Sequence, residues 1–177
     1  MAFYGVGAAR FRRGLPGLLA LAITAALFAA GKEVVRFLRV ENVQGRVEVV
    51  DGDSLRMAGD DIRLSGIDAP ELHQTCFRGA AEEPCGRAAR AALLELVGRA
   101  PVTCAVSGRD RYDRKLAVCK AGEVELNRAM VRAGRAVAYG DYESEEDEAR
   151  RARRGLWAGR FERPADWRAR HPRPHGS

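Results

Sequence analysis

Residues 51–71 read D-G-D-S-L-R-M-A-G-D-D-I-R-L-S-G-I-D-A-P-E, a series of acidic residues separated by short apolar segments. Alternate residues of an extended strand share a face, so Asp51 and Asp53 are expected to point the same way. Gly-Asp-Asp at 59–61 is a turn signal, and a hairpin there would bring this acidic pair towards Asp68. The stretch therefore predicts a cluster of carboxylate oxygens, which are the ligands that hard divalent cations prefer.

Two further residues give this cluster the components of a phosphoryl-transfer site. Arg63 precedes Asp68 by five residues and Glu71 follows it by three, directly after the strand-ending Pro70. A metal ion, a base and a guanidinium are what phosphoryl transfer requires. Either half alone, D-G-D or D-A-P-E, is also an ordinary turn sequence with solvated carboxylates, so the specificity lies in their combination.

The composition is that of a folded domain with a basic N-terminal segment. The chain has 177 residues, of which 46% are hydrophobic and 31% charged, which fits a globular rather than a disordered protein. The net charge of +6 is uneven, because residues 1–40 hold six Lys or Arg and one acid. The remaining residues are nearly balanced, so any nucleic-acid surface has to be inferred from local clusters.

An uncharged run from Gly14 to Gly31 follows a basic stretch and is itself followed by Lys32. As a helix, its 18 residues would span roughly 27 Å, about the thickness of a bilayer core. We expect an uncleaved transmembrane signal-anchor within residues 1–40. A cleaved signal peptide is the alternative, with small residues at 29–31, and a buried core helix is disfavoured because the run has no polar face.

The cysteines favour disulfides over a metal site. No spacing among the four matches the C-x2-C of a zinc site, and an even number after an export-type segment suits an oxidising compartment. Three pairings are possible, and we predict Cys76–Cys85, closing a short loop, and Cys104–Cys119, joining two strands. Four buried free thiols in a reducing compartment are the alternative.

Hydrophobic periodicity and turn signals predict an α+β domain that is mainly a β barrel. The expected elements are strands over 41–50, 54–57, 62–67, 101–106 and 116–120, a loop over 72–84, and helices over 86–97, 124–133 and from Ser144, with Asp147 completing a capping box. This order fits a five-stranded OB-fold barrel with three helices, although other α+β arrangements share it. Residues 160–177 are rich in Pro and Arg and are expected to form a wrapped or mobile tail.

The pattern D-G-D-S…R-L-x-G-I-D-A-P-E resembles that of the staphylococcal-nuclease-like (thermonuclease) family, and the resemblance runs from about Val43 to Trp157. It includes D-R-Y-D-R at 110–114, V-R-A-G at 131–134 and R-G-L-W at 154–157. The resemblance implies an OB-fold barrel for residues 41–159 and a calcium-dependent nuclease that cleaves DNA and RNA with little sequence preference.

By position, the resemblance also implies roles for individual residues. Asp53, Asp68 and the backbone carbonyl of Ala69 are expected as calcium ligands. Glu71 is expected as general base, with positioning of the attacking water as the alternative. Arg63 and Arg114 are expected to hold the scissile phosphate, because planar guanidinium groups fit its equatorial oxygens.

Aromatic and basic residues further along the chain suit single-stranded nucleic acid, through stacking and phosphate contacts. The expected set is Arg111, Tyr112, Tyr139 and Tyr142, each tyrosine being equally compatible with a half-buried core position. The sequence departs from the family at Asp113, where the family more often has glycine. A glycine there tolerates a positive φ better than aspartate, and the added carboxylate would weaken the attraction of Arg114 for phosphate.

The first functional hypothesis is an extracytoplasmic, anchored or secreted, Ca2+-dependent nuclease acting by in-line attack of water, with single-stranded substrates favoured and no protein partner implied. The second is a non-catalytic OB-fold module that binds nucleic acid on the cell envelope. A third is an envelope interaction protein that binds calcium for structure only.

Overall fold

The structure is a computed structural model, and it describes residues 41–172. The predicted signal-anchor lies outside the described residues. Between residues 41 and 172, no helix is both long and apolar enough to cross a membrane.

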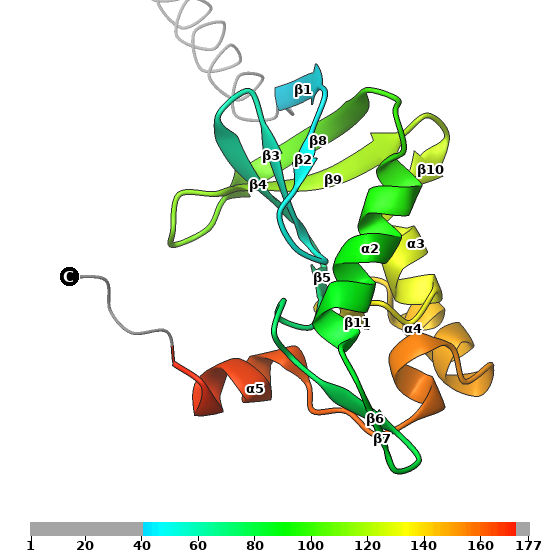
Figure 1. Cartoon of the computed structure of the whole chain (residues 1–177). Coiled ribbons are helices and arrows are strands. Elements are labelled where there is room, and N and C mark those ends of the chain that lie inside the picture. The colour runs from blue at the N-terminus through cyan, green and yellow to red at the C-terminus, as the bar shows by residue number, and fades with distance from the viewer. Residues whose placement is uncertain (1–40, 173–177) are drawn as a thin grey trace, which may run out of the picture. The chain divides into compact units, whose positions relative to one another are not determined.

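Six of the seven strand segments of a curled sheet form one continuous path (Figure 1). They are β1 (Glu41–Gly45), β2 (Glu48–Val49), β3 (Ser54–Met57), β4 (Asp60–Leu64), β8 (Val102–Arg109) and β9 (Lys115–Ala121). Their order is β1-β8-β9-β4-β3-β2, with β4 and β9 parallel and the other pairs antiparallel. Only Arg46 and Val47 separate β1 from β2, so one bent strand pairs with both ends of the sheet. This closure gives the OB-like barrel that the sequence predicted.

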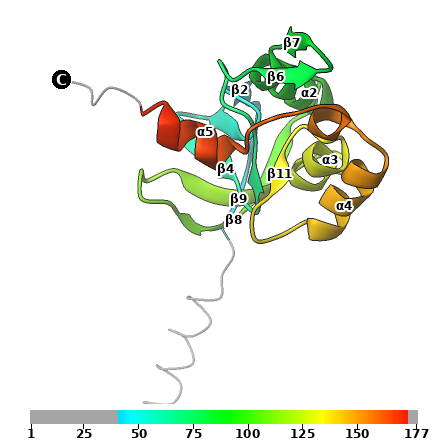
Figure 2. The same ribbon diagram turned by 90° about the horizontal axis from the view of Figure 1, so that it is seen from below.

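Helices and small sheets cover one end of this barrel (Figures 1 and 2). The helices are α2 (Cys85–Val97), α3 (Leu126–Arg132), α4 (Glu143–Arg151), the 3-10 turn η1 (Gly155–Ala158) and α5 (Pro164–Arg170). The remaining strands are β5 (Ile67–Asp68) paired with β11 (Val137–Ala138), β6 (Cys76–Arg78) paired with β7 (Ala81–Glu83), and β10 (Val124–Glu125) beside β9.

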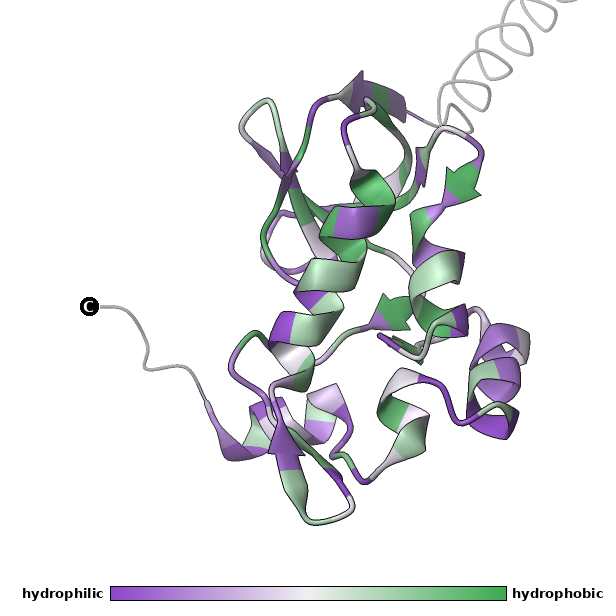
Figure 3. Cartoon of the chain, turned by 45° about the vertical axis from the view of Figure 1, so that its right-hand side comes forward, coloured by the Kyte–Doolittle hydropathy of each residue, from purple (hydrophilic) through white to green (hydrophobic). Residues whose placement is uncertain are grey.

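The core forms where α2 and α3 meet the inner face of the barrel. Leu55 and Ile62 come from facing positions of β3 and β4, Leu93 from α2 and Met130 from α3, and all four are fully buried. Burying one such side chain contributes about 1.5–3 kcal/mol. In contrast to these core positions, α4 consists mostly of hydrophilic residues (Figure 3). The core thus fixes β3 and β4, the two strands that carry the acidic stretch.

The predicted disulfides are confirmed, with Cys76 bonded to Cys85 and Cys104 bonded to Cys119. The second bond joins directly paired residues of β8 and β9 within the core. The first ties the β6–β7 hairpin to the start of α2.

Three details differ from the sequence analysis. The predicted loop 72–84 contains the β6–β7 hairpin, and Pro164–Arg170, within the segment expected to be a wrapped or mobile tail, form the helix α5. The predicted capping box is wrong: α4 begins one residue earlier, Tyr142 takes the cap position, and the Ser144 hydroxyl donates to the Glu145 carboxylate. With Ser144 already inside the helix, its side chain is no longer placed to accept the first free N–H groups.

Candidate active site

The site begins where β3 and β4 pair, because this register sets Ser54 opposite Arg63. Arg63 Nη1 donates to Asp53 Oδ1 at 2.9 Å, and the Ser54 hydroxyl donates to the same oxygen. The Ala69 N–H donates to Asp53 Oδ2 at 2.9 Å. Asp53 is therefore a buried carboxylate bonded through both oxygens, and its backbone N–H is held in turn by Asp51 Oδ1.

Arg63 also reaches the second predicted ligand, Asp68 on β5. Its Nη2 donates to Asp68 Oδ1 at 2.9 Å, so one guanidinium bridges two carboxylates. Asp68 is held in place by the pairing of β5 with β11, and its side chain is only 3% exposed. The hairpin predicted from residues 51–71 thus brings Asp53, Arg63 and Asp68 together.

A second arginine, which the sequence analysis did not identify, completes the cluster from α5. Arg168 donates through Nη1 and Nη2 to the two oxygens of Asp68, at 2.9 and 3.1 Å. The same Nη1 lies 3.2 Å from Glu71 Oε1. We call the resulting alternation of opposite charges the carboxylate–arginine chain; its members are Asp53, Arg63, Asp68, Arg168 and Glu71.

The sequence contains two weak signals for the start of α5. Pro164 occupies a position at the start of α5 where a missing N–H does no harm, and Asp166 lies in its first turn, near the positive end of the helix dipole. Neither signal indicates that Arg168 would meet residues about 100 positions earlier in the chain.

The electrostatics of the chain are dominated by burial. Burial raises the pKa of Asp53 to about 7, against the opposing attraction of Arg63, and the nearby Asp51 and Asp68 raise it further. The pKa of Arg63 is raised, because the attraction of Asp53 and Asp68 outweighs its own desolvation. The pKa of Arg168 is raised by Asp68 and Glu71 in the same way. The arginines stay charged. At Asp53, in contrast, the nearby positive charge does not offset the cost of burying the carboxylate.

This deficit of positive charge at Asp53 bears on whether the residues fit a divalent cation. No group of three or more His, Cys, Asp and Glu side chains with metal-site geometry occurs within residues 41–172. The predicted calcium site needs only two carboxylates, because a backbone carbonyl and water supply the other ligands. Calcium accepts such an all-oxygen set. Asp53 and Asp68 share one arginine, and a nearby cation would favour the charged form of Asp53, so the donors fit a hard cation.

The predicted phosphate ligand Arg114 lies in a separate structure, the β8–β9 turn, which we call the basic turn (residues 110–114). Its Nε and Nη2 contact Asp110 Oδ2 at 2.8 and 2.7 Å. Asp110 Oδ1 accepts the N–H groups of Tyr112 and Arg114, so this carboxylate organises the whole turn. Within residues 41–172, the carboxylate that Arg114 contacts is Asp110, and neither Asp53 nor Asp68 is among its partners.

The departure at Asp113 falls at a left-handed position, with φ of 64°. The structure therefore confirms why glycine suits this site better than aspartate. Asp113 also pairs with Arg109 through its carboxylate and accepts a hydrogen bond from it through its carbonyl, on the exposed side of the turn.

The predicted nucleic-acid residues divide into two groups. Tyr112 and Tyr139 are 65% and 68% exposed, so each ring is accessible for stacking on a base. The Arg111 guanidinium lies over the Tyr112 ring, 4.8 Å from its centroid. Tyr142 is half-buried against the core, and burial together with Glu125 raises the pKa of its hydroxyl. Its role in the structure is packing beside α4, and it does not share the exposure of the other two.

Comparison with known proteins identifies relatives for most of this domain. The family model of the staphylococcal nuclease homologue matches residues 61–159. Succinoglycan biosynthesis protein ExoI of Rhizobium meliloti (strain 1021) is 34% identical over 126 residues, which cover 66% of this chain and 65% of that protein. An uncharacterized endonuclease of Haemophilus influenzae is 32% identical over 142 residues, which cover 73% and 75%.

A third relative, probable staphylococcal-like nuclease CAN2 of Oryza sativa subsp. japonica, is 35% identical over 110 residues, which cover 58% of this chain and 27% of that protein. The chain thus spans just under two thirds of the Rhizobium protein and about a quarter of the rice protein. The family match includes Arg63, Asp68, Glu71 and Arg114, whereas Asp53 precedes it and Arg168 follows it.

Proposed function

The chain belongs to the staphylococcal nuclease homologue family, and on that premise we propose that it hydrolyses phosphodiester bonds in DNA and RNA. The observation that carries this proposal is the bridge that Arg63 forms between Asp53 and Asp68, with Glu71 joined to the same cluster. Each of these side chains has a role in in-line attack of water on a phosphate.

Glu71 is the proposed general base. Its side chain is 19% exposed, so a water molecule can reach the carboxylate and lose a proton to it. Arg63 has five N–H donors, of which one is given to Asp53 and one to Asp68, and the others are proposed to bind the equatorial oxygens of the phosphate. Water attacks phosphorus from the side of Glu71, which takes up its proton, and the bond from phosphorus to the leaving oxygen on the opposite side breaks. The leaving oxygen takes a proton from solvent, and the guanidinium stabilises the charge that develops on the phosphate.

Arg114 is proposed to bind the same phosphate after its contact with Asp110 breaks. Its side chain is 28% exposed, and its guanidinium is held by the Asp110 carboxylate within its own turn. Figures 1 and 2 both show the basic turn and α5 projecting from the same side of the barrel. A phosphate bound beside Arg63 is expected to draw Arg114 away from Asp110.

Calcium is the proposed cofactor, held by Asp53, Asp68 and the carbonyl of Ala69. Bound there, it would polarise the phosphate and lower the pKa of water. The all-oxygen donor set and the raised pKa of Asp53 support this assignment.

Single-stranded nucleic acid is the proposed preferred substrate. The exposed rings of Tyr112 and Tyr139 offer stacking surfaces that every base can use, and Arg111 adds a phosphate contact. Contacts of this kind carry little sequence information, in keeping with low sequence preference.

We assign the domain to an extracytoplasmic location, anchored or secreted through the N-terminal segment. The two disulfides support it, because such bonds persist in oxidising compartments.

The test is cleavage of single-stranded DNA and RNA by the disulfide-intact protein, with calcium and then with chelator. Glu71→Gln should lower turnover by roughly 10²- to 10⁴-fold through loss of the base. Glu82→Gln is the matched control, because Glu82 is exposed on the β6–β7 hairpin and should leave turnover unchanged. Binding that survives chelation without cleavage would replace this proposal with the non-catalytic module.

A further inference from the structure

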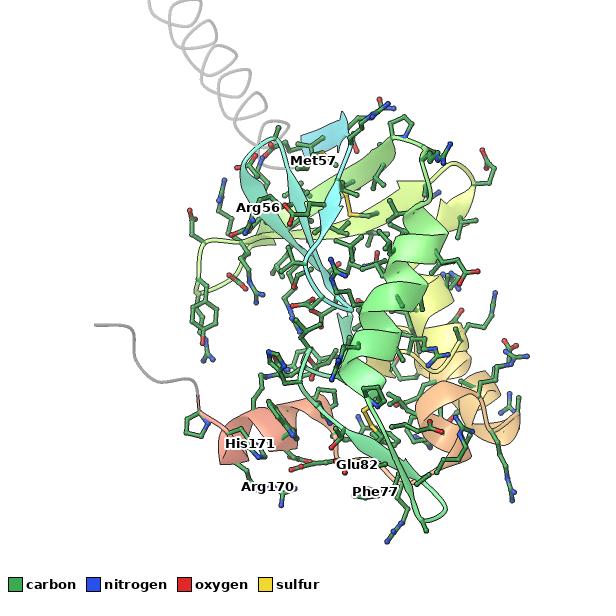
Figure 4. The ribbon with its side chains drawn as sticks, in the orientation of Figure 1. Arg56, Met57, Phe77, Glu82, Arg170 and His171 are labelled. Atoms are coloured by element: carbon green, nitrogen blue, oxygen red, sulfur yellow. A yellow bond between two sulfur atoms is a disulfide. The ribbon has the colours of Figure 1, made fainter. Side chains whose placement is uncertain are left out.

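The segment 160–170 begins where the family match ends, and it is fastened to the loop that carries Glu71. Phe77 and Arg160 exchange two backbone hydrogen bonds of 2.8 Å. The approach is so close that a Cβ on Gly159 would lie 2.0 Å from the Phe77 carbonyl oxygen. Figure 4 shows Phe77 of the hairpin and Arg170 of α5 at the same end of the molecule.

Gln74 provides the second attachment. Its side chain is completely buried, and its Nε2 donates to the Glu162 carbonyl at 2.8 Å. Its Oε1 accepts the N–H of Glu71 at 3.2 Å, and its own N–H donates to the Glu71 carbonyl at 2.7 Å. The backbone of Glu71 is thus connected, through one buried amide, to the segment that leads into α5.

Arg168 provides the third attachment, at the side chain of Glu71. From these contacts we propose that Arg168 is a positioning residue of the active site, which holds Glu71 in place by joining its carboxylate to that of Asp68. The inference rests on the nuclease activity proposed above and assigns to it a residue outside the family match.

The chemistry of the two side chains explains why such a residue matters. A glutamate has three rotatable side-chain bonds, and its ordering costs about 1–2 kcal/mol unless a partner fixes it. A base must be held within about 0.5 Å of its productive position. The planar guanidinium of Arg168 contacts both oxygens of Asp68 and one of Glu71, so it makes a rigid unit of two separate carboxylates.

The same geometry separates Arg168 from a general anchor of α5. A lysine would keep the positive charge but has no planar fork with which to contact Asp68 twice and Glu71 at once. Arg170 lies two residues further along the same helix, pairs with Glu162 and points away from the barrel (Figure 4). It is therefore the matched control for loss of an arginine from α5.

The experiment compares kcat and KM for single-stranded DNA cleavage by the full chain and by its Arg168→Ala, Arg168→Lys and Arg170→Ala variants. Arg168→Ala should lower kcat by roughly 10- to 100-fold with KM changed less than about threefold, as expected of a misplaced catalytic group. Arg168→Lys should restore less than about a tenth of the kcat that is lost in Arg168→Ala. Arg170→Ala should have the same kcat and KM as the chain without substitutions.

A double variant tests whether Arg168 acts through Glu71. If it does, adding Arg168→Ala to Glu71→Gln should lower kcat no further than Glu71→Gln alone, within about threefold. Multiplied losses would overturn the inference, because they would show an independent contribution. A rise in KM without a fall in kcat would also overturn it, since Arg168 would then be a substrate contact.

Calcium binding to the protein alone, followed by calorimetry, gives a readout separate from activity. The affinity of Arg168→Ala should stay within about threefold of the unchanged chain, since Arg168 both orients Asp68 and repels a cation. Binding about tenfold tighter would overturn the inference by identifying Arg168 as a competitor of the cation. An unchanged chain that binds calcium and folds but does not cleave would refute the proposed function, and this inference with it.

Discussion

Two sets of ion pairs face the proposed active site, and they are built in opposite ways. The carboxylate–arginine chain includes residues from β4, β5 and α5, and its contact between Asp68 and Arg168 joins positions 100 apart in sequence. The basic turn closes on itself within five residues, with Asp110 holding Arg114. The first set is fixed by the tertiary fold, whereas the second can rearrange without disturbing the rest of the barrel.

This difference separates stability from activity among the arginines. An arginine in a buried set compensates charges that cannot reach water, and its loss leaves those charges unpaired. An arginine in a local, partly exposed pair contributes little to stability and remains available to a ligand. The largest expected effect on stability therefore belongs to Arg63, and Arg114 should affect activity alone.

Arg63→Ala is the most severe test of this distinction. Removing the bridge leaves Asp53 and Asp68 buried without their shared cation, and we expect a loss of about 3–5 kcal/mol in the free energy of unfolding. Urea denaturation in chelator measures it. Arg56→Ala is the control, because Arg56 on β3 is half exposed and forms only surface pairs. Equal losses in the two variants would show that the bridge has no special role.

Arg114→Ala should show the opposite behaviour. Its removal should change the free energy of unfolding by less than about 1 kcal/mol, because only a partly exposed ion pair with Asp110 is lost. Turnover should fall by roughly 10²- to 10³-fold, the cost of removing one donor to a developing oxyanion. Arg109→Ala, on the same hairpin, should leave turnover unchanged. A marked loss of stability in Arg114→Ala would contradict the independence of the basic turn.

The pH dependence of stability in chelator should reveal the charge deficit at Asp53. Its pKa is raised from 3.8 to about 7 in the folded protein, so between these values the folded state keeps a proton that the unfolded chain has lost. The stabilisation that this proton provides is therefore present at low pH and is lost as pH rises. The free energy of unfolding should fall by roughly 2 kcal/mol between pH 5 and 7. Denaturation at several pH values measures it, and Asp53→Asn should remove the slope.

Carboxylates whose pKa values are lowered by their partners do not mask this window. The pKa values of Asp110, Glu145 and Glu148 are lowered by their arginine or backbone partners, so their stabilisation is complete above about pH 4.5. Stability that rises from pH 5 to 7 in chelator would rule out a raised pKa at Asp53.

Asp113→Gly should have the smallest effect. Glycine adopts the φ of 64° without strain, but it also gains freedom in the unfolded chain, so stability should rise by no more than about 1 kcal/mol. Removing the carboxylate beside Arg114 should also increase turnover modestly, by about two- to threefold at most. Thermal unfolding and single-stranded DNA cleavage measure the two effects, and a clear loss of stability would show that the Arg109 pair matters more than backbone strain.

The comparison also explains which parts of the site the sequence could predict. Asp53 and Arg63 lie on the β3–β4 hairpin and Asp68 follows it on β5, so strand periodicity and a turn signal were enough to predict that the three residues lie close together. The disulfide between Cys104 and Cys119 followed from two expected strands. The partner of Arg114 was not predicted, because the resemblance concerns phosphate binding, whereas Asp110 holds the arginine in the structure.

Arg168 was beyond sequence reasoning for a different physical reason. Its contacts depend on where the chain travels after Gly155, and tertiary packing decides that path. The arginine-rich composition of the last residues offers many equivalent candidates, and only the register of α5 selects Arg168. Long-range contacts by a single charged side chain leave no periodic trace in the sequence.

The distance along the chain between Asp68 and Arg168 also has a temporal meaning. A polypeptide is made from its N-terminus at about 5–20 residues per second, so Arg168 emerges roughly 5–20 s after Asp68, the two being 100 positions apart. The barrel strands, α2 and α3 can assemble during this interval, while Asp68 and Glu71 still lack one of their arginines. The cluster reaches its final arrangement only when synthesis of the domain is nearly finished.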